Sequence, residues 1–260
     1  MLGAACLTSL AAMRAGAGMV TAAVPKGLNL TLQKKISHVI MTLPVSQTRG
    51  MAFSFSAAKE ILKRISKFNV VAIGPGLSLD PSTVEFVRRI VRECSLPMVV
   101  DADALNALAR HTDILLKAKG PRILTPHPGE MSRLMRTTVG AASGRPIKEN
   151  DRKRISLAFA KKYKVVLVLK GHRSVVASPD GKIYTNTTGN AGMATAGAGD
   201  VLTGMIAAFL AQGMPPFDAA KWGVLLHGKA GDRAAKKHGK AGMIATDIID
   251  GLGAEYYAES

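Results

Sequence analysis

The sequence is poor in cysteine and in aromatic residues, and each shortage excludes a class of protein. Two cysteines, Cys6 and Cys94, occur among 260 residues, far apart and without a CxxC or Cys/His cluster. Neither a disulfide framework nor a zinc site is therefore expected, and the reducing cytoplasm is the expected compartment. Aromatic residues make up 5% of the chain, too few to supply stacking platforms for the bases of a nucleic acid.

Acidic residues are also scarce. The chain carries 18 acidic against 35 basic residues, a formal net charge of +17. Such an excess raises the possibility of a nucleic-acid-binding protein without catalytic activity. The basic residues are scattered along helical patterns, which favours solvated helix faces and no specific nucleic-acid partner. The main clusters are Lys34/Lys35, Arg88/Arg89/Arg92, Arg152/Lys153/Arg154, Lys161/Lys162/Lys164 and Lys236/Lys237.

A long uninterrupted apolar run is missing as well. The apolar residues 1–20 are broken by Arg14, and no basic segment precedes them. A signal peptide needs that positive charge, and a membrane-spanning helix needs about 20 apolar residues in a row. The pattern predicts a buried, Ala-rich helix and no membrane association.

Apolar runs and helical patterns alternate along the chain. The runs are continuous, as is typical of parallel strands covered by helices on both faces, so an α/β fold is expected. Expected strands are residues 19–25, 38–43, 69–74, 97–102, 122–126 and 165–171, and expected helices are 1–15, 56–68, 81–94, 102–110, 129–135 and 151–163.

The remaining segments differ from this alternation. Residues 174–186 hold two short β-prone runs around Pro179-Asp180-Gly181, which predicts an antiparallel hairpin. Helices are expected over 201–213, 216–239 and 245–257. The loop 137–147 is the segment expected to be most flexible, but it is too short to separate two domains. We expect one domain spanning residues 1–260.

The strongest chemical feature is the segment 196–204, AGAGDVLTG, in which a loop of small residues opens into an apolar helix. Free amides in the first helical turn and the helix dipole favour a phosphate group. A carboxylate at this place, Asp200, suits a base that activates a hydroxyl facing that phosphate. Taken alone, the loop leaves a simple helix-dipole role for Asp200 equally open.

Residues 189–213, GNAGMATAGAGDVLTGMIAAFLAQG, resemble the signature of the ADP/ATP-dependent NAD(P)H-hydrate dehydratases of the ribokinase-like superfamily. Segments 3–25, 72–78, 99–108, 124–134 and 165–181 are similar to the same family in the same order. The resemblance covers nearly the whole chain. It implies a ribokinase-like three-layer α/β/α fold with a mostly parallel central sheet, and nucleotide-dependent dehydration of the S form of hydrated NADH or NADPH.

The resemblance also implies roles for individual residues. Asp200 would be the catalytic base. Substrate would be bound by Ala4, Gly76, His127 and Asp200, and nucleotide by Lys170, Gly171, His172, Arg173, Ser174 and Gly199. Gly197, Ala198 and Gly199 would form the anion hole, and Glu130 would hold Mg²⁺, either directly or through water. ADP or ATP would be the co-substrate.

Without the resemblance, several of these residues have ordinary structural explanations. Glu130 would stabilise the helix that follows it, and His127 would bond to backbone. Lys170 would leave a buried strand for water. Asp101 and Asp103 form no convincing carboxylate pair: Asp103 is expected to cap a helix, and only Asp101 is well placed at a strand end.

The chain departs from the family pattern in two places. Ala196 and Ala198 replace a glycine and a hydroxyl residue of the loop, a change that amide binding tolerates. A strand and a Gly-Ser turn expected before Gly3-Ala4 are absent from these 260 residues, which would expose a sheet edge.

A small-molecule kinase of the same fold, acting on a sugar or vitamin alcohol, is the alternative enzyme. The segment TPHPGE (125–130) argues against it, because such kinases more often have asparagine at the position of His127. Family likeness further implies a homotetramer and an NAD(P)H-hydrate epimerase as functional partner.

Overall fold

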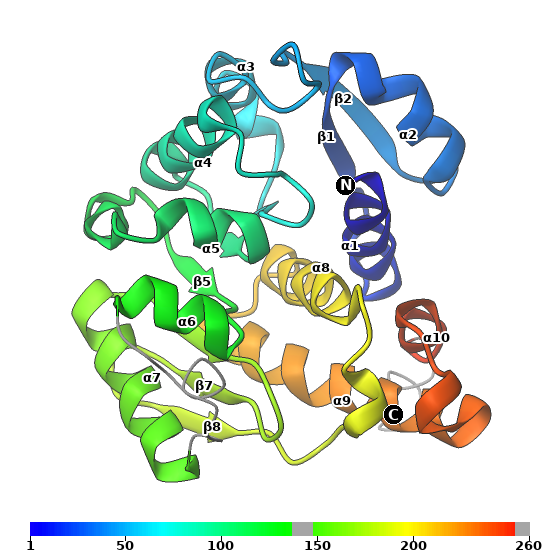
Figure 1. The fold of residues 1–260 in the computed structure, drawn as a ribbon, viewed down its shortest axis with the longest axis vertical. Helices are drawn as coiled ribbons and strands as arrows, with labels where there is room; N and C mark the ends of the chain where they lie inside the picture. The colour runs from blue at the N-terminus through cyan, green and yellow to red at the C-terminus, as the bar shows by residue number, and fades with distance from the viewer. Residues whose placement is uncertain (137–147, 253–260) are drawn as a thin grey trace.

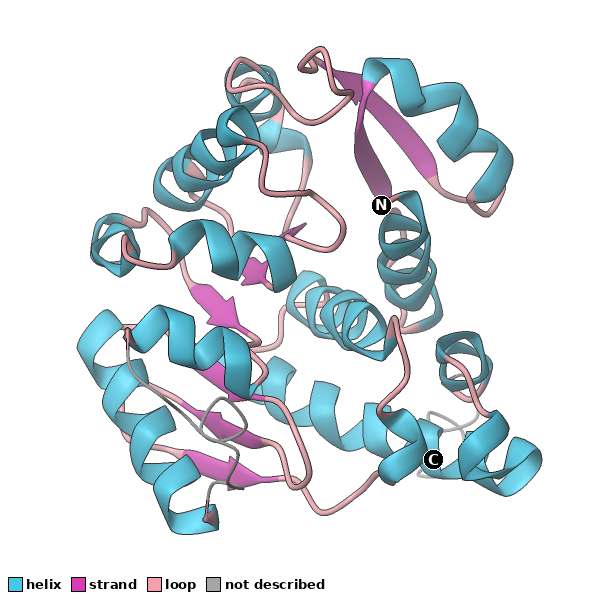
Figure 2. Cartoon of the chain, viewed as in Figure 1, coloured by secondary structure: helices cyan, strands magenta, loops and turns pink. Residues whose placement is uncertain are grey.

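The computed structural model describes residues 1–136 and 148–252. Its main sheet has six strands in the order β3-β4-β5-β6-β7-β8. Strands β3 (Val71–Ile73), β4 (Met98–Val100), β5 (Arg122–Leu124) and β6 (Val166–Leu169) are parallel, and β7 (Val175–Ala177) and β8 (Ile183–Thr185) add the predicted antiparallel hairpin. The predicted mostly parallel sheet is thus confirmed, and Figures 1 and 2 show it crossing the molecule.

Helices cover both faces of this sheet. One layer contains α3 (Ala57–Leu62), α4 (Pro81–Glu93), α5 (Ala102–Leu108), α6 (Pro128–Met135) and α7 (Glu149–Tyr163). The other contains α1 (Leu2–Arg14), α8 (Ala198–Ala211), α9 (Pro216–Gly242) and α10 (Ala245–Asp250). Successive strand residues face opposite layers: Met98 and Val100 pack into the first core, and Val99 packs into the second. Buried helices on both sides explain why the strands read as unbroken apolar runs.

The first two strands do not join the main sheet. β1 (Thr21–Pro25) and β2 (Met41–Val45) pair in parallel as a separate two-stranded sheet, covered by the short helix α2 (Asn29–Lys35). The expectation of a fully buried strand over 19–25 was wrong, because Met19 is exposed and strand residues Thr21 and Ala23 are only half-buried.

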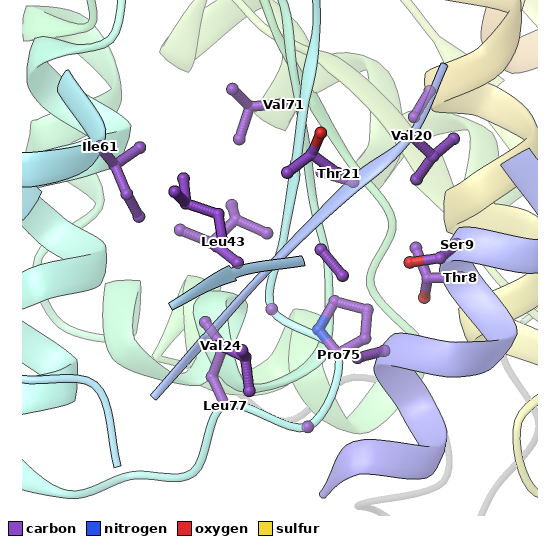
Figure 3. Close-up of a pocket in the computed structure, with 18 of the residues that line it drawn as sticks. Thr8, Ser9, Val20, Thr21, Val24, Leu43, Ile61, Val71, Pro75 and Leu77 are labelled. Carbon is purple, nitrogen blue, oxygen red and sulfur yellow. The ribbon is translucent and has the colours of Figure 1, made fainter. Parts of the chain in front are cut away.

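An apolar cleft of about 680 Å³ separates the two sheets (Figure 3). It is lined by α1, by β1 and by β3, with Val20, Val24, Val71 and Leu77 among its residues. Ala72, the middle residue of β3, is exposed. β3 is an end strand of the main sheet, and its outer edge borders this cleft without a neighbouring strand among the described residues.

Several predicted boundaries shift. Helix 56–68 ends early as α3 and is followed by a 3₁₀ turn at Ile65–Lys67, α2 was not predicted, and the last helix ends at Asp250. The predicted flexible loop 137–147 and the predicted helical residues 253–257 lie outside the described residues.

Most of the basic residues that were expected to be solvated are exposed, among them Lys34, Lys35, Lys236 and Lys237. Arg88, Arg89 and Lys153 are half-buried, and Arg152 is buried. Its guanidinium donates to the carbonyl of Leu169 at 2.9 Å. Helix α1 is the expected Ala-rich helix, and no helix in the described part of the chain has the length and hydropathy to cross a membrane.

Candidate active site

Polar side chains gather where the parallel strands end. Asp101 follows β4, Thr125 to His127 follow β5, and Lys170 follows β6. The carboxyl ends of parallel strands share one edge of the sheet, which is where open α/β sheets bind their ligands. Helix α8 begins at the same edge, because Gly199 in its first turn lies beside Lys170 and Asp101.

The loop before α8 forms an open anion site. Gly197, the N-cap residue, has a φ of 89°, a left-handed conformation that suits glycine. Val201 is the first residue of the helix whose amide bonds back, to the Gly197 carbonyl at 3.1 Å. No hydrogen bond within the described residues uses the amides of Gly199 and Asp200, so these two remain for a ligand. The amide of Ala198 is already directed to the Thr195 carbonyl at 3.4 Å, whereas no hydrogen bond within the described residues uses the amide of Gly197, another predicted anion-hole residue.

Asp200 lies in the first turn of α8 and is half-buried. Burial, together with the negative charge of Asp101, raises its pKa to about 6, although the positive charge of Lys170 acts in the opposite direction. A carboxylate with a pKa near the working pH suits a general base. A simple helix-dipole role would lower the pKa instead.

His127 and Glu130 form a capping box at the start of α6. The His127 Nδ1 accepts from the amide of Gly129 at 3.0 Å, and the Glu130 carboxylate accepts from the amide of His127 at 2.8 Å. These are the bonds of the ordinary structural explanation. The His127 ring is nevertheless half exposed, although both ring nitrogens have neighbours, since its Nε2 lies 3.4 Å from Glu130 Oε1. Burial lowers the pKa of His127, which favours the neutral ring.

Asp101 belongs to this group of residues, although the prediction from sequence did not include it in the site. It is 1% exposed and occupies the N-cap position of α5, yet it makes no capping bond. Its Oδ1 pairs with the Lys170 ammonium at 2.7 Å, and its Oδ2 accepts from the Thr203 hydroxyl at 2.7 Å. Asp103 does not cap the helix either: its carboxylate accepts from the amide of Ser78 at 2.8 Å. The position of Asp101 at the end of a strand was the one feature of the sequence that indicated a place in the site.

Lys170 lies at the centre of the charged groups. Its ammonium is 3.9 Å from Glu130 Oε2, and a Cβ on Gly199 would lie 3.3 Å from it. The side chain is 18% exposed. It does not leave the core for water, as a lysine at the end of a strand usually would.

The rest of the predicted nucleotide segment turns outward. Gly171, His172 and Arg173 are exposed, Arg173 pairs with Glu149 at 3.3 Å, and the Ser174 hydroxyl donates to the Gly171 carbonyl at 3.1 Å. The segment therefore forms an exposed rim next to Lys170.

Ala4 and Gly76, both predicted to bind substrate, lie against each other. A Cβ on Gly76 would meet the backbone of Met1 and lie 3.1 Å from the Ala4 Cβ, and its φ is 69°. Any larger residue would separate α1 from the loop after β3. The nitrogen of Met1 donates to the Gly76 carbonyl. A Cβ on Gly197 would collide with Leu7 of α1, so the helix that carries Ala4 packs beside the anion loop and this pair borders the same site.

Helix α9 supports the segment that leads into the anion loop. The Thr188 hydroxyl donates to the Leu225 carbonyl at 2.9 Å, and the Asn190 amide donates to Asp232 at 3.0 Å. A Cβ on Gly228 would collide with Thr188. His227, which the sequence did not indicate, is buried beside the backbone of Ala198, and burial lowers its pKa to about 4. Its Nε2 has no hydrogen-bond partner among the described residues, so a neutral, buried imidazole lies behind the loop.

Known proteins are similar to this chain in sequence and in fold. The chain is similar to the bifunctional NAD(P)H-hydrate repair enzyme of Moorella thermoacetica, 48% identical over 252 residues that cover 97% of this chain and 46% of the relative. It is 38% identical to the ADP-dependent (S)-NAD(P)H-hydrate dehydratase of Neisseria meningitidis over 252 residues, 95% of this chain and 78% of the relative. The chain spans about half the length of the bifunctional relatives.

A solved structure is similar as well. The ADP/ATP-dependent NAD(P)H-hydrate dehydratase of Bacillus subtilis, crystallised with ATP and Mg²⁺, matches with a TM-score of 0.77 and 30% identity, covering 98% of this chain and 84% of that one. The fold is ribokinase-like. The family model described as NAD(P)H-hydrate dehydratase matches residues 1–253. The chain therefore belongs to the NAD(P)H-hydrate dehydratase family.

Proposed function

We propose that this chain uses ADP or ATP to dehydrate the S form of hydrated NADH or NADPH, a metabolite-repair reaction. The observation that carries the proposal is Asp200: a carboxylate with a pKa raised to about 6 stands beside the free amides that begin α8. The Neisseria relative is named for this reaction with ADP. The relatives described above are named as repair enzymes and dehydratases, and none of these names supports the sugar- or vitamin-kinase alternative.

In the proposed mechanism, Asp200 takes the proton from the ring hydroxyl of the hydrated dinucleotide. The hydroxyl oxygen bonds to the terminal phosphorus of the nucleotide, and the bond to AMP (from ADP) or to ADP (from ATP) breaks. The amides of Gly199 and Asp200 hold the oxygens of the transferred group. Phosphate then leaves the ring carbon, pushed by the ring nitrogen, and loss of a neighbouring ring proton restores NADH or NADPH.

The site residues fit a water-mediated magnesium ion. The described residues include no group of three or more His, Cys, Asp or Glu side chains arranged to hold a metal. Mg²⁺ at phosphates usually needs only one or two carboxylates, with waters and phosphate oxygens completing its shell. Glu130 would hold it through water, because this buried carboxylate stands at the edge of the sheet where Lys170 and the start of α8 meet. When bound, the ion neutralises charge on the nucleotide phosphates.

The substrates divide between two sides of the anion loop in this proposal. The rim formed by 170–174 would bind the nucleotide, with Lys170 and Gly199 nearest to its phosphates. Ala4, Gly76 and His127 would border the hydrated dinucleotide, the first two giving close approach to backbone and the third an imidazole edge. The contact of Gly76 with Ala4 supports this placement.

The test is an absorbance assay at the reduced-nicotinamide band with hydrated NADH, Mg²⁺ and either ADP or ATP. Recovery of the band that depends on nucleotide, with AMP or ADP released in equal amount, is the expected result. Consumption of nucleotide only when a sugar or vitamin alcohol is added would assign the chain to the kinases instead.

We expect the turnover of the enzyme to fall on the acidic side with a midpoint near pH 6. Burial, the first cause, raises the pKa of Asp200 to about 6, and the base acts only when deprotonated. Activity is therefore retained above this pH and lost below it. A profile of kcat/KM between pH 4.5 and 8 checks this. A midpoint near 4 would mean that the carboxylate is not in the environment described.

The proposal extends to the domain and its partners. Residues 1–260 would form one dehydratase domain that acts in the cytoplasm, as two distant free cysteines support. Likeness to the family supports a homotetramer, and the bifunctional names of several relatives support an NAD(P)H-hydrate epimerase as functional partner.

This domain would also need one more strand. The amide of Val71 bonds to Pro97, and the carbonyl of Ile73 accepts from Asp101, so both residues face β4 and the exposed Ala72 between them faces the cleft. In β1, the Val20 carbonyl accepts from Met41, so Thr21 and Ala23 face the cleft from the other side. Both edges run in the same direction in Figure 3. A parallel strand between them would end near Gly76 and connect directly to Met1.

A further inference from the structure

We propose that Lys170 contacts the transferred phosphoryl group and that Asp101 is the residue that positions it. This inference rests on the proposed function and deepens it, because the resemblance assigns Lys170 only to the nucleotide segment and gives Asp101 no role. The ammonium lies 2.7 Å from Asp101 Oδ1 and 3.3 Å from where a Cβ on Gly199 would be. It is thus the nearest described cation to the free amides of the loop.

Residues from three elements, β4, β6 and α8, meet around the ammonium of Lys170. Asp101 comes from the end of β4 and Lys170 from the end of β6. Thr203, on the second turn of α8, donates its hydroxyl to the second Asp101 oxygen at 2.7 Å. A carboxylate held by a hydroxyl and 1% exposed cannot rotate freely, so it fixes its partner relative to the loop that begins the same helix.

The backbone next to Asp101 is strained. Ala102 has a φ of 47°, a left-handed conformation that is unfavourable for a non-glycine residue. Asp101 occupies an N-cap position but leaves the helix amides without a side-chain cap, although a capping aspartate ordinarily stabilises a helix. Strain and a lost cap are both consistent with an orientation set by the site.

The opposing explanation is a structural ion pair. A buried pair contributes little net stability, although loss of one partner is strongly destabilising. Such a pair would have no reason to point its cation at the anion loop. Lys170 keeps 18% of its side chain exposed, whereas Asp101 is closed off. The open end of the pair is therefore the ammonium, which faces the place of the phosphoryl group.

The test is a double-mutant cycle of wild type, Asp101→Asn, Lys170→Met and the double variant. If Asp101 acts through Lys170, the Asp101→Asn change lowers kcat about 10-fold or more in the wild type and less than about twofold beside Lys170→Met. Fold losses that multiply in the double variant, or an unchanged kcat with a lowered melting temperature, would overturn the proposal. The exposed pair Asp180–Lys182, at 3.2 Å, gives a matched control cycle with no expected effect on kcat.

A second readout needs no hydrated dinucleotide. ADP with Mg²⁺ and aluminium fluoride mimics a phosphoryl group in transfer, and its affinity should follow the same cycle while the affinity for AMP stays constant. If the wild type does not turn over hydrated NADH but the affinities for the ADP–aluminium fluoride complex follow the expected cycle, the dehydratase function alone is refuted. If turnover is normal but the effects of the two substitutions on affinity are additive, the role of Asp101 alone is refuted.

If Asp101→Asn does not fold, Thr203→Val takes its place. It removes one of the two bonds to Asp101 and leaves the charge, so a smaller loss of kcat in the same direction is expected, again absent beside Lys170→Met. A loss that persists beside Lys170→Met would contradict the proposal.

Discussion

Replacing Asp200 with asparagine should reduce kcat by roughly 10²- to 10⁴-fold while the affinity for ADP changes little. Asparagine has almost the same shape but cannot accept the proton, and the amides of Gly199 and Asn at position 200 still face the nucleotide phosphates. Turnover from the reduced-nicotinamide absorbance and nucleotide affinity from calorimetry, measured on one preparation, check the two halves of this result.

The stability of this variant has a definite sign. The pKa of Asp200 is raised from 3.8 to about 6 in the folded protein, so folding favours the protonated form and the charged carboxylate is a cost above pH 6. The neutral asparagine removes that cost. The melting temperature at pH 7.5 should therefore not fall below that of the wild type, and any gain should vanish below pH 4.

Asp218 provides a matched control. It too is an acidic residue in the first turn of a helix, α9, and the site does not use it. If Asp200 only complemented its helix dipole, Asp200→Asn and Asp218→Asn would affect turnover equally. A near-normal kcat for Asp200→Asn would remove this residue from the mechanism.

An added N-terminal strand should raise the melting temperature by several degrees. The segment Lys-Val-Val-Val-Ile-Gly-Gly joined to Met1 would lie in the cleft between β1 and β3. If burial of its four apolar residues stabilises the protein by a net amount of about 2 kcal/mol, the melting temperature rises by roughly 4–8 °C. The amides of Ala72 and Ala23, which face the cleft, should exchange with solvent at least about tenfold more slowly.

The control is a polar segment of equal length, Lys-Ser-Gly-Ser-Asn-Gly-Gly, which lacks the apolar residues that the cleft would bury. It should leave melting and exchange unchanged. Equal melting temperatures for the two extended chains, with no new protection at Ala72, would show that the cleft does not take a strand.

The parts of the structure that depend on local pattern could be predicted. Continuous apolar runs identified β4 and β6, the turn at 179–181 identified the hairpin, and the small-residue loop identified the start of α8. The pairing of Asp101 with Lys170 could not be predicted, because the two residues are 69 positions apart and each had an ordinary local explanation. The burial of Arg152 could not be predicted for the same reason. Its partners are carbonyls at the end of β6, and only the tertiary structure brings them close to Arg152.

The separate sheet β1–β2 shows that strand pairing could not be predicted from the sequence pattern. The period of a strand shows which residues can be buried, but not which strand lies beside it. The apolar residues of segment 19–25 predict a buried strand. Ala22 and Val24 are indeed buried. The neighbour on the other side is what decides the exposure of Ala23, and it lies outside any local window.

The support that α9 gives to the anion loop determines when during synthesis the site can form. Asn186 and Gly189 bond to residues 38 and 43 positions later in the chain, so these contacts close only after Asp232 has been made. Contacts between distant residues form late because chain entropy must first be lost. A ribosome-bound chain that ends before α9 should thus have a formed α4–β4–α5 region without an ordered phosphate loop, and the ability to bind nucleotide should appear only after α9 has been made.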